Sequence, residues 1–225
     1  IHPRVLHLFR SHFARSLKHL ASDFDSMMRN VAAALWRTRP GWSQVVDLQV
    51  RLPLRWGGLG LRPVEEIAPA AYLGSWAQVL PDVERLVGGA PILGPAAPAS
   101  PTATAVQAAA EEWRVLAARP GAEPVDWETV RAQPRGLLKQ QRVLSLAVDR
   151  ERRQRLRRVA SLEDWTRVQN CAGIWAGVWL TVPPPAHGLS FLDGEYAALA
   201  RVGCRLPLQP EGGPCRRGGS RGPGG

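Results

Sequence analysis

The sequence contains only three cysteines, and their spacing excludes both a disulfide framework and a zinc site. Cys171, Cys204 and Cys215 are an odd number at wide intervals, with no Cys-x-x-Cys pair and no histidine placed to complete a tetrahedral site. This cysteine usage indicates a reducing compartment, and therefore an intracellular protein.

The chain also lacks the residue patterns that catalysis requires. No Asp-Asp pair occurs, and no serine lies in a Gly-x-Ser-x-Gly elbow. Four of the five histidines fall within the first 19 residues. Steps of five residues rotate successive side chains by about 140° around a helix, so these histidines do not converge on one ligand. The sequence therefore predicts no catalytic residue, no metal and no cofactor in this chain.

Long apolar runs are absent as well. Apolar residues make up 45% of the chain, but no stretch approaches the uncharged run of about 20 residues that a membrane span requires. The segment from His2 to Leu20 interleaves Arg and His with apolar residues, which excludes a secretory signal. An acid-poor, Arg-bearing start is compatible with a transit peptide, whereas a start at Ile1 favours an internal fragment. No membrane partner is expected.

Acidic residues are outnumbered by basic ones. Twenty-nine Lys and Arg face nineteen Asp and Glu, which gives a formal charge of +10 and a sequence pI near 11.0. Nearly all of the excess is Arg, whose planar guanidinium can bind a phosphate with two hydrogen bonds and can stack on a base. Nucleic acid is therefore the expected partner, ahead of an acidic protein or a membrane surface.

Apolar periodicity predicts a mainly helical protein. One helix is expected from Val5 to Leu20, followed by a second that starts at the N-cap Ser22, buries Phe24, Met28, Val31 and Leu35, and stops at Pro40-Gly41. Later helices are expected at 43–50, 64–80 with an interruption at Pro69, 106–119, 126–132, 134–159, after the N-cap Ser161, and at 191–202.

Composition divides the chain into four parts. These are a helical region with a glycine loop (1–87), a flexible linker of Gly, Pro, Ala, Ser and Thr (88–105), a second helical region (106–208) and a disordered Gly/Arg tail (209–225). The loop contains Gly57, Gly58 and Gly60. It has neither a Gly-Lys-Ser/Thr ending nor a GxGxxG pattern, so a structural turn with positive φ angles is favoured over a phosphate cradle.

Six arginines on one predicted helix are the main candidate for nucleic-acid binding. Arg152 and Arg155 fall in the same arc as the apolar Leu144, so we expect the second half of the helix to protrude into solvent or onto a partner. A phosphate-contacting helix is favoured over a solvated charged face, because arginines at this density repel one another without an anion. The six are Arg150, Arg152, Arg153, Arg155, Arg157 and Arg158.

The nine tryptophans have two interpretations. Trp175 and Trp179 are four residues apart, which is typical of core aromatics on a helix, although indoles can also stack on bases. A role in the core is favoured for these two and for Trp113, Trp127 and Trp165.

Three segments together resemble reverse transcriptases of non-LTR retrotransposons. Residues 51–62, RLPLRWGGLGLR, followed by AAYL at 70–73, are similar to the LP…GGLG…AAYL stretch after the catalytic domain of that family. Phe24-Asp25 lies in a helix similar to the family's thumb helices. Residues 176–180, AGVWL, and 192–196, LDGEY, are similar to its downstream segments. The chain departs from the pattern at Gly203-Cys204-Arg205 and lacks a Cys/His knuckle beyond it.

The resemblance implies the thumb and connecting region of an RNA-directed DNA polymerase. The palm, with its magnesium-binding aspartates, would precede Ile1, and the protein would act in the nucleus. The first helices, which carry Arg10, Arg15 and Lys18, would hold a primer–template duplex, and the arginine helix would contact RNA, DNA or an RNA–DNA hybrid. The alternative is a helical adaptor that uses the arginine helix to bind an acidic protein.

Overall fold

The computed structural model of the protein describes residues 3–12, 17–38, 41–93, 100–118, 140–173, 193–204 and 206. Within these segments the regular secondary structure is helical, which confirms the predicted mainly helical fold, and one isolated β-bridge joins Trp56 to Ala172. The helices are α1 (Pro3–Ser11), α2 (Lys18–Leu35), α3 (Gln44–Arg51), α4 (Val64–Leu86), α5 (Pro101–Ala117), α7 (Gln140–Val159), α8 (Leu162–Asn170) and α10 (Asp193–Cys204). None of the helices described has the length and apolar character needed to cross a bilayer.

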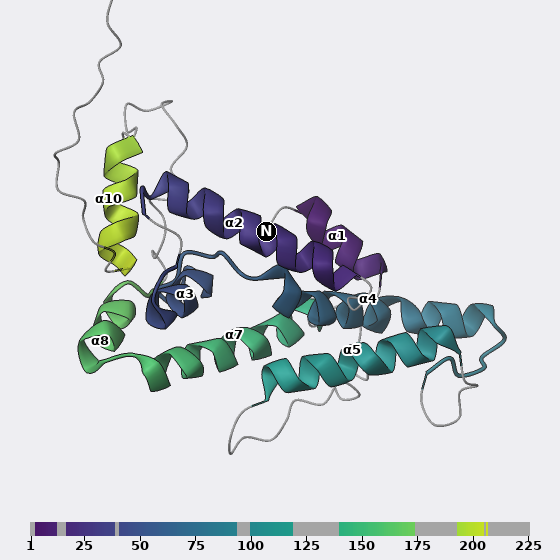
Figure 1. The fold of residues 1–225 in the computed structure, drawn as a ribbon. Coiled ribbons are helices and arrows are strands. Elements are labelled where there is room, and N and C mark those ends of the chain that lie inside the picture. The colour runs from purple at the N-terminus through teal and green to yellow at the C-terminus, as the bar shows by residue number, and fades with distance from the viewer. Residues whose placement is uncertain are drawn as a thin grey trace, which may run out of the picture.

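The longest helix, α4, lies at the centre of the fold and packs against α1, α2, α5 and α7 (Figure 1). A helix covered on several sides needs apolar residues around its whole circumference, and the first half of α4 meets this requirement. Its largest core is shared with α5 and α7, where Trp113 is buried and donates its indole N–H to the carbonyl oxygen of Leu144 at 3.1 Å. The predicted core role of Trp113 is confirmed.

Close backbone contact between α4 and α7 depends on Gly74. A Cβ atom at this position would lie 2.6 Å from Cβ and 2.7 Å from Cα of Gln141. Real Cβ atoms do not approach other heavy atoms so closely, so a side chain at Gly74 would force the helices apart. The apolar run of α4 is therefore interrupted by the one residue that allows α7 to cross it.

The loop from Leu52 to Pro63 is held against α8 by glycine backbone. Gly57 and Gly60 have φ angles of 81° and 75°, which confirms the predicted turn with positive φ. Cβ atoms at Gly57 and Gly58 would lie 2.2 Å from the carbonyl oxygen of Val168 and 2.1 Å from that of Leu52. These contacts leave no room for any side chain, so the Gly-Gly pair fixes the loop in place.

A buried glutamine joins this loop to α8 and α10. The side-chain amide of Gln49 on α3 donates to the carbonyl oxygens of Gly57 and Gly203, at 3.0 and 2.9 Å, and its oxygen accepts from Arg167. Arg201 of α10 in turn donates to the backbone oxygens of Trp36 and Arg37. Figure 1 shows the result, with α8 and α10 at one end of the molecule and α5 along the other.

The N-terminus of α4 is capped from a distance by α2. The carboxylate of Asp25 accepts hydrogen bonds from the backbone N–H groups of Val64 and Glu65, at 2.8 and 3.0 Å. These are two of the amides that a helix start leaves without an internal partner. Burial raises the pKa of Asp25 above its ordinary value, and the two N–H groups oppose that shift because they favour the carboxylate. Asp25 thus fixes α2 to the start of α4.

Several predicted helix boundaries and faces are wrong. Helix α2 begins at Lys18 and not after Ser22, and its buried residues are the small Ala21, Ala32 and Ala33. Val31 and Leu35 are exposed. Small side chains allow the neighbouring elements to approach α2 closely. Phe24 and Met28 are half-buried, and Phe24 packs against the cluster that contains Ala21.

Two proline predictions also fail. Pro69 and Pro81 both lie inside α4, which continues through them because its buried contacts outweigh a proline penalty of about 3 kcal/mol. Helix α5 begins at Pro101, within the segment interpreted as a linker, because the hydroxyl of Ser100 accepts from the amide of Ala103 and proline fits the first turn. The N-cap at Ser161 is confirmed.

Other predictions lie outside the described residues. They include the helix at 126–132, the start of the helix at 134, the tryptophans Trp127, Trp175 and Trp179, and the tail 209–225. The final helix is confirmed as α10, and its predicted start at Phe191 also lies outside the described residues.

Replacing Gly74 by alanine should lower the free energy of unfolding by about 1 to 3 kcal/mol, because the added methyl group overpacks the crossing with α7. Urea denaturation followed by far-UV circular dichroism measures the change. Gly203→Ala is the matched control, since a Cβ there meets nothing within 4 Å. We expect it to be neutral or stabilising by up to about 1 kcal/mol, because alanine favours a helix. Equal effects at the two positions would contradict the crossing.

We expect Cys171 to react with thiol reagents and Cys204 to remain unmodified in the folded protein. Burial raises the pKa of the Cys204 thiol to about 12, whereas Cys171 is exposed. Because the thiolate is the nucleophile, a Cys215→Ser variant at pH 8 should show one rapidly titrating thiol with Ellman's reagent and a second only after denaturation. Two rapid thiols would mean that α10 is not docked as described.

Candidate nucleic-acid interface

The arginine helix α7 presents its charges in three directions, and one of them is inward. Arg152 is only 1% exposed. Its guanidinium pairs with Glu66 of α4 and, at 3.0 Å, with Asp149 of α7. Asp149 also accepts from Arg62 at 2.6 Å. Burial raises the pKa of Asp149, and the two guanidinium groups oppose that shift by favouring the carboxylate.

The expectation that the second half of α7 protrudes is therefore wrong. Arg152, Glu151 and Leu156 are all buried there, because the carboxylates of Glu66 on α4 and Asp149 on α7 balance the charge of Arg152. In this conformation Arg152 is not accessible to a phosphate.

A second group of arginines is paired within α7 itself. Glu151 accepts from Arg158 at 2.6 Å and lies 3.6 Å from Arg155. Both arginine side chains remain about half exposed. Glu151 itself is buried, so releasing both arginines would leave its carboxylate without a counter-charge, and we place these two arginines in the structural role of balancing Glu151.

The third group stacks on tryptophans and forms what we call the arginine–indole ladder: Arg55, Trp56, Arg153, Trp165 and Arg157. Arg55 and Arg153 lie over the ring of Trp56, at 5.1 and 5.7 Å from its centroid. Arg153 and Arg157 lie over the ring of Trp165, at 5.6 and 5.8 Å. Cation–π contacts of this length attract a guanidinium to the face of an indole ring and so restrict its movement.

Three segments supply the ladder. Trp56 forms a β-bridge with Ala172, and the amide of Gly173 donates to the carbonyl oxygen of Arg55 at 3.1 Å. This pairing places the loop beside the end of α8, which carries Trp165. Arg153 also donates to Gln169 of α8 at 3.2 Å. The ladder is therefore built where the glycine loop, α7 and α8 meet.

A basic groove adjoins the ladder at Arg55. It has a volume of about 530 Å³ and is lined by four arginines and one carboxylate, namely Arg10, Arg55, Arg62, Arg142 and Asp149. Because Arg62 already pairs with Asp149, the groove has a net positive charge. Arg10 is held toward the groove by hydrogen bonds of 2.9 and 2.6 Å to Gln141. Groove and ladder together form what we call the basic track.

The structure distributes the predicted binding residues unevenly. Arg10, Arg153 and Arg157 lie on the basic track, and Arg150 is exposed on α7. Lys18 is exposed on α2, 3.7 Å from Glu65. Arg15 lies outside the described residues.

Sequence reasoning missed Arg55, Trp56, Arg62 and Arg142. It assigned Trp165 to the core, and Trp165 does pack against a buried cluster while remaining half-buried. One sequence feature could have indicated Arg55 and Trp56. They immediately precede Gly57-Gly58, and glycines mark a loop, whose neighbouring residues can lie on the surface. Nothing in the sequence shows that this loop meets α7.

Comparison of the chain with protein-family models, curated proteins and solved structures gives no match.

Replacing Arg152 by methionine should lower the free energy of unfolding by about 3 kcal/mol or more, because the carboxylates of Glu66 and Asp149 lose a shared counter-charge in a buried site. Arg157→Met, which removes an exposed cation–π contact, should cost less than about 1 kcal/mol. Urea denaturation compares the two variants. A smaller loss for Arg152→Met than for Arg157→Met would show that the buried ion pairs are not formed.

Proposed function

We propose that this protein binds the phosphate backbone of nucleic acid along the basic track, without catalysing a reaction itself. The observation that carries the proposal is the arginine–indole ladder. Guanidinium groups that are already restricted by contact with tryptophans lose less side-chain entropy when they bind a phosphate. The unpaired basic charge of the groove extends the same surface past Arg55 to Arg10 and Arg142.

The chemistry of the track favours binding without sequence preference. Contacts to phosphate position a protein on nucleic acid but carry no base information. In the ladder, each indole lies next to two guanidinium groups, so its role is to orient arginines. The expected ligand is therefore a duplex or hybrid recognised through its backbone.

The resemblance to non-LTR reverse transcriptases supplies a context for this activity. In that context the chain would be the thumb and connecting region, and it would hold the primer–template or target beside a palm in the full-length protein. The segment that carries the resemblance, 51–62, also supplies Arg55 and Trp56. The magnesium-dependent chemistry would belong to the palm.

Binding should weaken steeply with salt, and the slope should depend on the track. Each phosphate neutralised changes the slope of log K against log salt by about −0.9 on B-DNA. Replacing Arg55, Arg142 and Arg157 by glutamine should therefore flatten the slope by roughly 2 to 3. Filter binding of a labelled duplex and of an RNA–DNA hybrid from low to physiological salt measures it.

The matched control removes the same charge elsewhere. Arg29, Arg85 and Arg114 are exposed and lie off the basic track, so replacing these three by glutamine should change the slope little. Equal flattening by both triple variants would mean that net charge alone drives binding. No affinity for RNA, DNA or hybrid at low salt would sink the proposal and favour an adaptor for an acidic protein.

A further inference from the structure

A second cleft lies between α2 and α3, away from the ladder. Its inner part has a volume of about 80 Å³ and apolar walls that include Phe24, Met28, Val50 and Leu61. Its outer part, about 570 Å³, is lined mainly by polar residues. Trp42, Arg29 and Asp47 line both parts, so the two parts adjoin at these residues. This form suits a ligand with a flat, largely apolar end and a polar end that remains in water.

One end of the cleft is formed by a tryptophan pair. Trp36 is buried, and Trp42 stacks on it with ring centroids 5.2 Å apart and an angle of 27° between the planes. The indole N–H of Trp42 donates to Thr38 at 3.2 Å, which fixes the ring further. Trp42 is only half-buried: it packs against the core cluster that contains Trp36, and it also lines the cleft. An indole held in this way is a rigid platform for a second flat ring.

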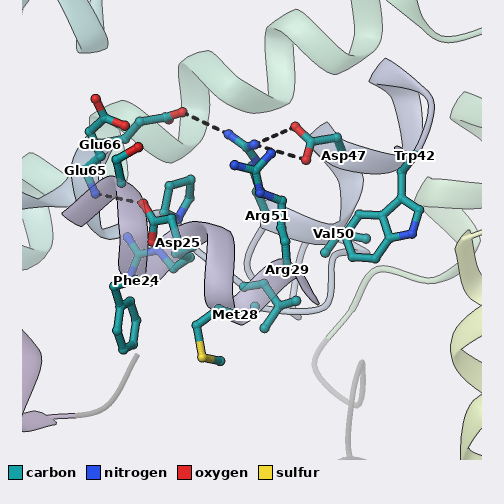
Figure 2. Close-up of a pocket in the computed structure, with 15 residues that line it drawn as sticks. Phe24, Asp25, Met28, Arg29, Trp42, Asp47, Val50, Arg51, Glu65 and Glu66 are labelled. Carbon is teal, nitrogen blue, oxygen red and sulfur yellow. Dashed lines mark hydrogen bonds and ion pairs between the residues drawn. The ribbon is translucent and has the colours of Figure 1, made fainter. Parts of the chain in front are cut away.

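The carboxylates in the inner part already have partners. Figure 2 shows Arg51 between Asp47 and Glu66, with ion pairs of 2.8 and 3.4 Å. At the end opposite Trp42, Asp25 accepts from the amides of Val64 and Glu65. Their remaining acceptor capacity can take N–H groups of a ligand edge, as carboxylates do from the exocyclic amines of bases. Because these carboxylates are already paired, they do not form an acidic metal-binding site.

Arg29 differs from the other arginines of the cleft. Arg51 and Arg62 are paired with carboxylates, whereas Arg29 is exposed at the mouth and makes no ion pair or hydrogen bond within the described part of the chain. Ser26, Asn30 and Gln44 surround it in the outer part of the cleft. The carboxylate of Asp47 also lines this part, but it is paired with Arg51. A guanidinium that has no carboxylate partner of its own suits a phosphate.

We propose that this cleft binds one nucleotide, with the base against Trp42 and the phosphate at Arg29. The ligand is recognised by stacking and by the charge of its phosphate, and it comes either as a free nucleotide or as an unpaired nucleotide of a strand. The site shares only Arg62 with the basic groove, so it does not depend on the function proposed for the track.

Titration of the full chain with AMP, GMP, CMP and UMP, followed by saturation-transfer difference NMR, tests the proposal. We expect saturable binding of at least one of them. Trp42→Leu should weaken it about tenfold or more, which is the loss that base–aromatic stacking implies. Arg29→Gln should weaken binding of the nucleotide about fivefold but leave binding of the corresponding nucleoside unchanged, because only the phosphate meets Arg29.

Two controls separate this site from the track. Arg157→Gln should leave mononucleotide affinity unchanged, and Arg29→Gln alone should leave the salt slope for a duplex unchanged. Circular dichroism checks whether Trp42→Leu disturbs the fold. If it does, the proposal is still tested by comparing nucleotide and nucleoside binding in the Arg29→Gln variant, because the Arg29 side chain is exposed and its replacement should not disturb the fold. Competition by a duplex with one bulged nucleotide, but not by a fully paired duplex, would identify a strand as the source; competition by neither would identify the free nucleotide.

The proposal is overturned if none of the four mononucleotides binds saturably at millimolar concentration. It is also overturned if they bind but Arg29→Gln weakens nucleotide and nucleoside equally, because the phosphate would then lie elsewhere.

Discussion

The fold depends on the neutralisation of one buried guanidinium. Arg152 points from α7 into the interior, where it also lies 3.5 Å from the backbone oxygen of Arg51. Moving a charge out of water is costly unless charged partners surround it, and here they come from α4 and α7. Helices α4 and α7 must therefore be docked together before this arginine can be buried, which makes their docking cooperative.

Local patterns predicted the helices well, because a helix needs only periodic apolar residues and suitable ends. Ser161 accepts from the amide of Asp164, as its position before an amphipathic segment indicated. The fate of Arg152 was not predictable, since its partner Glu66 lies 86 residues earlier and nothing local marks the pair. The role of Trp56 could not be predicted for the same reason, because its partners are distant in the sequence. A loop residue becomes part of a site only when tertiary structure brings another segment to it.

The two candidate surfaces differ in how they treat tryptophan. In the ladder, guanidinium groups lie over both indoles, so the rings serve to orient charge. In the cleft, Trp42 has another indole on one side and open space beside it. The first arrangement suits a polyanion with a regular backbone, and the second suits a single flat ring. The two proposed surfaces share no aromatic residue, so a substitution in one leaves the tryptophans of the other in place.

The cap that Asp25 places on α4 has a mechanical consequence. The turn of α4 that begins at Val64 and receives this carboxylate also carries Glu66, the residue that pairs with Arg152 on α7. A displacement of α2 would leave two amides of that turn without acceptors and loosen the support of Glu66. Helix α2, which lines the cleft, and the arginine helix α7 therefore both contact the first turn of α4, so a movement of either helix would strain that turn.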